Sequence, residues 1–279
     1  MAVFQPAEET AEGAQAMIDD GLFDRFPKPD VVLGQHVMPG PAGVVSYRAG
    51  TTQAASDSLQ VRMFGRGGHG SMPEATVDPV VMSASTVMRL QTVVSREIAA
   101  TDAAVLTDGA LQAGTKENVI PDEATIKPNV RTFDGDMREK VPDAIKRIVE
   151  AEAEASNAPK SPEITPIDRY PLTVNDPDAT ARVARAFGDH FDHDCVEELS
   201  APVPASEDFC SFGAEWHATS VFRYIGGTDP DTYDKARQVE RVVQNIPTNH
   251  SPNFAPVIHP TLEVGVEAMV VAARAWLSS

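Results

Sequence analysis

A run of six expected elements between residues 58 and 171 most limits what this chain can fold into. It opens with SLQVRMFGRG, which alternates apolar and polar residues, the period of a half-exposed strand. The expected elements are a strand at 58–67, a helix at 78–97, strands at 103–114 and 122–133, a helix at 138–155 and a strand at 162–171. The order βαββαβ is that of a split βαβ unit. We therefore expect a ferredoxin-like α+β domain at 55–171.

An α/β pattern flanks this segment on both sides. Before it, we expect the end of a strand at Val3–Phe4, a helix at 8–20 and a strand at 30–38, whose continuous apolar run is typical of a strand buried on both faces of a mostly parallel sheet. After it, we expect a helix at 178–191, a strand at 219–227 and a helix at 260–278.

These patterns predict a fold of class α/β in which one domain is inserted into another. We expect 1–54 and 172–279 to form the larger α/β domain and 55–171 to be the insertion. The α/β part has few strands for a sheet of this kind, and the chain opens at a strand end. Both features lead us to expect that upstream sequence is absent and that this domain is incomplete.

Charge and composition exclude several functions. The 279 residues carry a formal net charge of -18, which repels nucleic acid phosphates and anionic lipids. We therefore expect no nucleic acid partner. We also expect no membrane, since no apolar stretch reaches the roughly 18 residues of a spanning helix. The N-terminus lacks the basic and apolar regions of a signal peptide. Cys195 and Cys210 show no disulfide or metal spacing, so we expect a cytoplasmic protein.

Glu8 and Glu9 are adjacent carboxylates and are candidates for a catalytic or metal-binding site. They follow the expected strand end, and ligand sites in open α/β sheets lie beyond the carboxyl ends of strands. His36, near the end of the 30–38 run, and His250, in a polar loop, could reach the same crevice. Such donors suit Zn²⁺ or a similar divalent ion. The alternative is that the acidic pair favours a helix dipole and each histidine is structural, because the spacings are not a regular metal signature.

Other polar positions stand at loops and strand boundaries. Glycines crowd His69 in GRGGHGSMP, which permits close backbone approach by a ligand. Asn118 and Arg131 lie at strand boundaries, and Arg131 could clamp a carboxylate bidentately. SEDF, at 206–209, holds another acidic pair. The structural alternatives are a plain glycine loop, an exposed strand arginine and a helix cap at Ser206 or Asp208.

Seven short motifs in order, covering nearly the whole chain, resemble those of one family. They are FQPAEE (4–9), GQHV (34–37), GRGGHGSMP (65–73), NVIPDEA (118–124), NVRTF (129–133), SEDF (206–209) and NHSPNF (249–254). The chain resembles the di-metal amidohydrolases that include hippurate hydrolase, N-acyl-amino-acid aminoacylases and indole-acetyl-amino-acid hydrolases. This resemblance implies a zinc-peptidase-like α/β catalytic domain and makes 55–171 a ferredoxin-like lid that pairs subunits in a homodimer.

The resemblance also implies a role for each residue of the catalytic centre. Glu8 looks like the general base that activates the attacking water. Glu9, His36 and His250 look like metal ligands, and the cofactors implied for the family are two divalent ions of zinc, manganese, cobalt or nickel. His69 looks like the lid histidine that polarises the scissile carbonyl, reaching into the partner subunit's site.

The same resemblance implies which residues bind the substrate and what the substrate is. Asn118 and Arg131 look like lid residues that help to hold the substrate, which is implied to be an N-acyl amino acid. A dipeptidase of the same family is an alternative. A catalytically inactive dimerising fragment is another, since the family's upstream ligand motifs, one with Asp and one of Cys-Gly-His-Asp type, do not occur in the sequence. Cys195 and Cys210 lie in the wrong places to substitute, so we expect a partial metal site.

Overall fold

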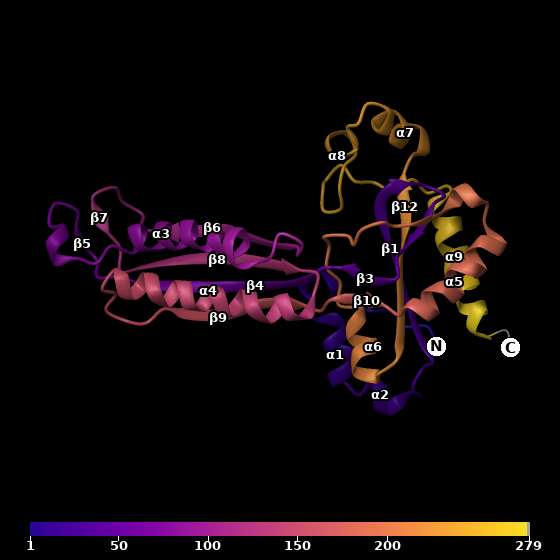
Figure 1. The fold of residues 1–279 in the computed structure, drawn as a ribbon, viewed down its shortest axis with the longest axis horizontal. Coiled ribbons are helices and arrows are strands. Elements are labelled where there is room, and N and C mark those ends of the chain that lie inside the picture. Colours follow the sequence, from indigo (N-terminus) through magenta and orange to yellow (C-terminus); the bar gives the residue numbers. More distant parts are fainter. Residues whose placement is uncertain (278–279) are drawn as a thin grey trace.

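The computed structural model describes residues 1–277, which form two lobes joined at a narrow base (Figure 1). One lobe, called the lid below, is built on β4 (Ala55–Phe64), β6 (Ala104–Ala113), β8 (Glu123–Thr132) and β9 (Glu163–Tyr170). These strands lie in the order β6-β8-β4-β9, and every neighbouring pair is antiparallel. Helices α3 (Pro79–Thr92) and α4 (Gly135–Ala155) pack on the sheet. The ferredoxin-like order of elements is therefore confirmed.

Local signals explain why the lid helices begin where they do. Asp78 accepts a hydrogen bond from the amide of Val80, and Pro79 opens α3. The helix continues into a π-helical turn at Val93–Glu97. Helix α4 begins three residues before the predicted position, because Asp134 caps it through the amides of Asp136 and Met137.

The lid core fills the space between sheet and helices. Alternate residues of β4 and β8 are buried, among them Val61 and Ile126, and they pack against Leu90 of α3 and Ile145 of α4. Each of these four side chains is fully buried. The alternation that the sequence shows in these strands thus corresponds to one face on the core and one face toward solvent.

The tip of the lid carries a second, smaller pairing. Strands β5 (Gly68–His69) and β7 (Val119–Ile120) form an antiparallel pair, next to the short helical turn η2 (Pro73–Ala75). In Figure 1 this pair lies at the end of the lid that points away from the other lobe.

The second lobe contains a mixed sheet with the order β1-β12-β2-β11. Strand β1 (Val31–Pro41) runs parallel to β12 (Thr219–Thr228), whereas β2 (Val45–Tyr47) is antiparallel to β12, and β11 (Val196–Glu198) is parallel to β2. The strands predicted at 30–38 and 219–227 are confirmed. Within the described residues β1 is an outer strand, so most of its residues are half-buried rather than buried on both faces as expected.

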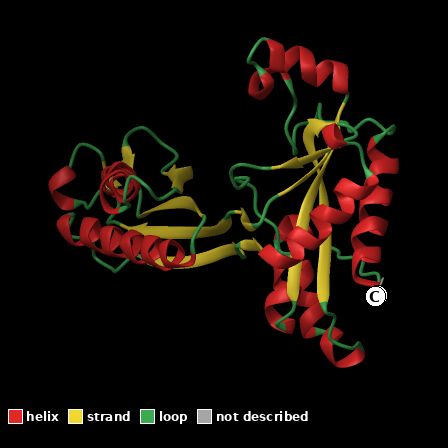
Figure 2. Ribbon diagram, turned by 45° about the vertical axis from the view of Figure 1, so that its right-hand side comes forward, coloured by secondary structure: helices red, strands yellow, loops and turns green. Residues whose placement is uncertain are grey.

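Helices cover both faces of this sheet (Figure 2). Phe222 and Tyr224 of β12 point to the face where α1 (Gly13–Asp19), α2 (Leu22–Arg25) and α6 (Cys210–Trp216) pack. Val221 and Ile225 point to the opposite face, against α5 (Pro177–His190) and α9 (Thr261–Leu277). The helices predicted at 178–191 and 260–278 are thereby confirmed.

The remaining elements connect the lobes and cap the sheet. Strands β3 (Gly50–Gln53) and β10 (Thr173–Asn175) pair at the base of the lid. The short 3-10 turn η4 (His193–Cys195) precedes β11. Helices α7 (Pro230–Gln238) and α8 (Val242–Asn245) project above the carboxyl ends of β1 and β12 (Figure 1). No helix within residues 1–277 has the length and apolar character needed to cross a bilayer.

Two expectations about the N-terminal segment are wrong. Val3 and Phe4 do not end a strand: residues 1–7 form no helix or strand, and the Phe4 side chain is 90% exposed. An extended segment becomes a strand only where a neighbour pairs with its backbone, and no described strand does so here. The helix expected at 8–20 is divided into the 3-10 turn η1 (Glu8–Thr10) and α1, because Ala11 between them adopts a left-handed φ angle of 56°. Ala7, just before η1, is also left-handed, with a φ angle of 50°.

Candidate active site

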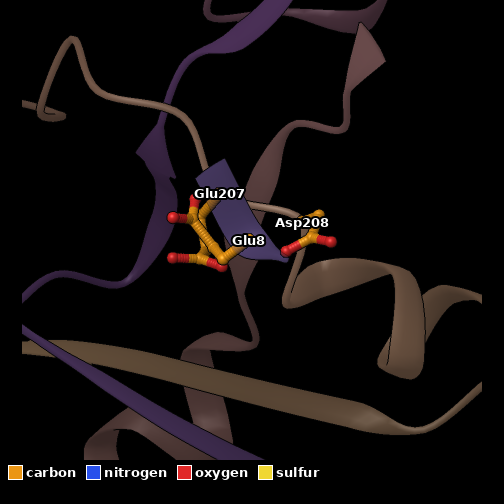
Figure 3. Close-up of side chains that lie close together, drawn as sticks. All are labelled: Glu8, Glu207 and Asp208. Atoms are coloured by element: carbon orange, nitrogen blue, oxygen red, sulfur yellow. The ribbon is translucent and has the colours of Figure 1, made fainter. Parts of the chain in front are cut away.

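Three carboxylates from distant parts of the chain meet in one cluster (Figure 3). Glu8 comes from η1, and Glu207 and Asp208 come from the SEDF loop before α6. One carboxylate oxygen of each lies within 4.8 Å of the others. Glu207 and Asp208 are buried and Glu8 is half-buried, so the cluster is largely removed from water.

Backbone amides fix the two buried carboxylates. The amide of Phe209 donates to Glu207 Oε1 at 3.2 Å, and the amide of Ala14 donates to Asp208 Oδ2 at 3.0 Å. The Gln5 side chain also donates to Asp208. Asp208 therefore satisfies a free N–H at the start of α1, a helix distant in sequence. The helix cap expected at Ser206 or Asp208 is wrong for the helix that follows, because the N-cap of α6 is Phe209 and no side chain caps it.

Crowding of like charges changes the protonation of the cluster. Burial, together with the neighbouring charges of Glu8 and Asp208, raises the pKa of Glu207 to about 8. Burial and the charges of Glu9 and Asp208 also raise the pKa of Glu8, while His250 lowers it. A site with this much negative charge favours a proton or a cation in its immediate neighbourhood.

The structure brings Glu9 and His250 together although 241 residues separate them in the sequence. His250 Nδ1 lies 3.5 Å from Glu9 Oε2, and both side chains are mostly exposed. Two ligands about 2.0 Å from one tetrahedral zinc ion are separated by about 3.3 Å, so this distance fits two donors of a single ion. The acidic pair lies in the first turn of the three-residue η1 and not in that of α1, which begins at Gly13, so the helix that it could stabilise is this short turn alone.

His36 lies in the middle of β1, opposite Tyr224 of β12, rather than near the strand end as expected. Its Nδ1 is 2.8 Å from the carbonyl oxygen of Val37, and the same oxygen accepts a hydrogen bond from the Asn249 side chain at 3.0 Å. The loop of His250 therefore crosses β1 next to His36. Within residues 1–277, Glu9, His36 and His250 do not form a group of three donors within 4.8 Å of one another.

His69 and Asn118 lie together at the tip of the lid. Strand pairing sets His69 opposite Val119, and the amide of Gly70 donates to the carbonyl of Asn118 at 2.8 Å. His69 Nδ1 is 2.7 Å from Ser71 Oγ. The tip lies at the opposite end of the lid from the lobe that carries Glu8 (Figure 1), so the structure does not bring His69 to Glu8 of the same chain.

Arg131 lies at the other end of the lid, at the base. Its Nη1 donates to the carbonyl of Pro204 at 2.8 Å and is 3.1 Å from Ser206 Oγ. Arg131 therefore contacts the segment that leads into Glu207 and Asp208. The two residues expected to hold substrate, Asn118 and Arg131, occupy opposite ends of the lid within one chain.

Residues 1–247 match the family model for peptidase family M20/M25/M40. The chain belongs to this family. A hippurate hydrolase of Campylobacter jejuni is 38% identical over 210 residues, which are 75% of this chain and 54% of that protein. This M20-family chain spans about half the length of the curated relatives it matches.

Solved structures of similar proteins have the same fold as this M20-family chain. A putative aminohydrolase from methicillin-resistant Staphylococcus aureus has a TM-score of 0.76 at 30% identity, over 97% of this chain and 64% of that one. A Bacillus subtilis protein described as a dinuclear metal-binding peptidase of the M20 family has a TM-score of 0.69 at 23% identity, over 98% and 63% of the two chains. This second similarity supports the α/β fold alone.

Sequence reasoning underestimated two features of this M20 site. The SEDF pair was weighed as a helix cap, and its place beside Glu8 emerges only from the tertiary structure. The second feature is Tyr170, whose hydroxyl donates to the carbonyl oxygen of Glu8 at 3.2 Å. No local pattern marks Tyr170 in the sequence, because its contact depends on how the last lid strand meets the N-terminal turn.

Proposed function

We propose that the protein containing this chain is a metal-dependent amidohydrolase that cleaves N-acyl amino acids into a carboxylic acid and a free amino acid. The observation that carries this proposal is the position of Glu8, on the turn that also bears Glu9, with Glu9 lying 3.5 Å from His250. Further support comes from the identity of 38% to a hippurate hydrolase.

The donor set fits a divalent ion such as Zn²⁺ or Mn²⁺. Glu9, His36 and His250 would hold it, since they supply one carboxylate and two imidazoles on adjoining segments. When bound, the ion supplies Lewis acidity, which polarises the amide carbonyl and makes the attacking water more acidic. A second ion, as in the dinuclear relative, belongs to the same proposal.

Side chains of the protein carry out proton transfer, oxyanion stabilisation and substrate binding. Glu8 takes the proton from the attacking water and passes it to the leaving amine, in the role of general base and then general acid. His69 hydrogen-bonds the oxyanion of the tetrahedral intermediate. Asn118 and Arg131 bind the substrate, and the Arg131 guanidinium suits the carboxylate of the amino acid product.

This assignment requires two copies of the chain. His69 lies at the lid tip, away from Glu8 of the same chain, so we propose a homodimer in which each tip reaches the partner's site. The lid offers apolar side chains for such pairing: Val81 and Met88 of α3 are 65% and 73% exposed, and Val105 and Leu111 lie on the outer strand β6.

The domain boundaries and the location of the protein are also proposals. We propose a catalytic domain of 1–54 and 172–279 and a lid domain of 55–171, which is supported by the start of β4 at Ala55 and the end of β9 at Tyr170. Both cysteines are free thiols, which agrees with a cytoplasmic protein.

A dipeptidase is the second candidate, because the family description is that of a peptidase. Phenylacetylglycine and phenylglycylglycine separate the two, since they differ only by an ammonium group beside the scissile bond. We expect kcat/KM for phenylacetylglycine to be higher by at least about tenfold, because the ammonium group must lose its hydration to enter an acyl pocket.

The measurement is initial-rate release of glycine from each compound by the metal-loaded protein. A preference for phenylglycylglycine would replace the aminoacylase proposal with the dipeptidase. Hydrolysis of neither compound would favour a catalytically inactive dimerising fragment.

A further inference from the structure

Tyr170 joins the lid to the turn that carries Glu8. It is the last residue of β9, and its hydroxyl donates to the carbonyl oxygen of Glu8 at 3.2 Å. The same oxygen accepts the amide of Ala11 at 2.9 Å, the hydrogen bond that closes η1. The lid thus contacts this turn at the peptide group next to the Glu8 side chain.

The lid holds Tyr170 firmly from the other side. Its carbonyl oxygen accepts a hydrogen bond from Arg138 Nη2 at 2.8 Å. Arg138 is itself paired bidentately with Asp57, at 2.9 and 3.1 Å, and Arg169 adds a contact to Asp57 at 3.1 Å. Asp57 is 8% exposed. Because bidentate guanidinium–carboxylate pairs fix geometry, β4, α4 and β9 together set the position of Tyr170.

The turn lies at the surface and is strained, although the carbonyl of Ala7 accepts internal hydrogen bonds from the amides of Thr10 and Glu12, both at 3.4 Å. None of the residues of η1 is buried, and both flanking alanines adopt the left-handed conformation, which disfavours residues other than glycine. A strained, surface turn of this kind keeps one conformation only where its surroundings enforce it. Burial and the nearby Glu8 charge raise the pKa of Tyr170 to about 12, so its hydroxyl remains a donor at neutral pH.

We propose that Tyr170 is a positioning residue for the general base, holding the Glu8 turn in one orientation against the base of the lid. This inference rests on the proposed function, because it assumes that Glu8 is the base. It extends that function by coupling the lid to the orientation of Glu8 within one chain.

The test is Tyr170→Phe in the metal-loaded protein, with Tyr224→Phe as a matched control. Tyr224 also donates its hydroxyl to a backbone carbonyl, but to that of Thr52, which is not part of η1. For Tyr170→Phe we expect kcat on phenylacetylglycine to fall about 3- to 10-fold, the worth of one hydrogen bond, with KM changed less than about twofold. Tyr224→Phe should keep the wild-type kcat.

A second readout needs no turnover. Amide hydrogen exchange at Ala11, followed by NMR, should be faster in Tyr170→Phe than in wild type or Tyr224→Phe, because the turn opens more often. Unchanged exchange, unchanged kcat, or an effect on KM alone would each overturn the positioning role. If the wild-type protein hydrolyses no substrate, the proposed function fails, whereas the Ala11 exchange still decides whether Tyr170 holds the turn.

Discussion

Replacing Glu8 with glutamine is expected to lower kcat for N-acyl amino acids by about 10²- to 10⁴-fold, the usual contribution of a general acid–base residue. Glutamine keeps the size of the side chain but cannot accept the proton of the attacking water. The protein should remain folded, because the substitution removes the charge of one of three crowded carboxyl groups. Metal content should also be retained, since Glu9, His36 and His250 are unaltered.

Glu12→Gln is the matched control for this substitution. Glu12 is an exposed glutamate just after η1, and its removal leaves the cluster of Glu8, Glu207 and Asp208 intact. We expect its kcat to equal that of the wild type. Near-normal kcat in Glu8→Gln, with equal metal content in both proteins by elemental analysis, would show that Glu8 is not the base.

Replacing His69 with glutamine is expected to lower kcat by about 10²- to 10³-fold, the cost of losing one oxyanion donor. The more specific expectation concerns mixtures. When the inactive Glu8→Gln and His69→Gln proteins are mixed and allowed to exchange subunits, half of the dimers become hybrids. Each hybrid has one site with wild-type Glu8 from one subunit and wild-type His69 from the other.

The mixture should therefore recover about a quarter of the wild-type activity per site, although each parent is inactive. His193→Gln is the control, because His193 is fully exposed and lies outside the lid. Mixing Glu8→Gln with His193→Gln should give about half of the wild-type activity whether or not subunits exchange, so exchange itself is followed by native mass spectrometry of the mixed samples. No recovery with the His69 variant, together with proven exchange, would contradict the action of the lid tip on the partner's site.

The helices and strands of the lid could be predicted because short-range sequence signals determine them. Alternating residues define its strands, and the Asp78–Pro79 start of α3 is a short-range signal that the structure reproduces. The N-terminal segment was not predictable in the same way. Val3 and Phe4 have strand-like composition, but a strand needs a paired neighbour. No local pattern in the sequence marks the left-handed conformations of Ala7 and Ala11.

The candidate site likewise contains some features that could be predicted from the sequence and others that depend on tertiary contacts. Glu9 and His250 were expected to lie close together, and the structure places them 3.5 Å apart. The carboxylates of Glu207 and Asp208 join Glu8 only through the packing of the SEDF loop against α1, which is a tertiary contact. Whether His69 and Asn118 act at the site stays a prediction, because it depends on a second copy of the chain.

The most direct test of the metal site is elemental analysis of the purified chain after dialysis against trace zinc or manganese. We expect at least about one ion per chain in the wild type and less than about a tenth of that in Glu9→Ala and His250→Ala, because both donors bind the same ion. His259→Ala is the matched control, since His259 Nδ1 also lies beside an exposed glutamate, 2.9 Å from Glu263 Oε1, at the start of α9. It should keep the wild-type metal content. A wild-type chain without metal, or unchanged metal in the Glu9 and His250 variants, would contradict the proposed metal site.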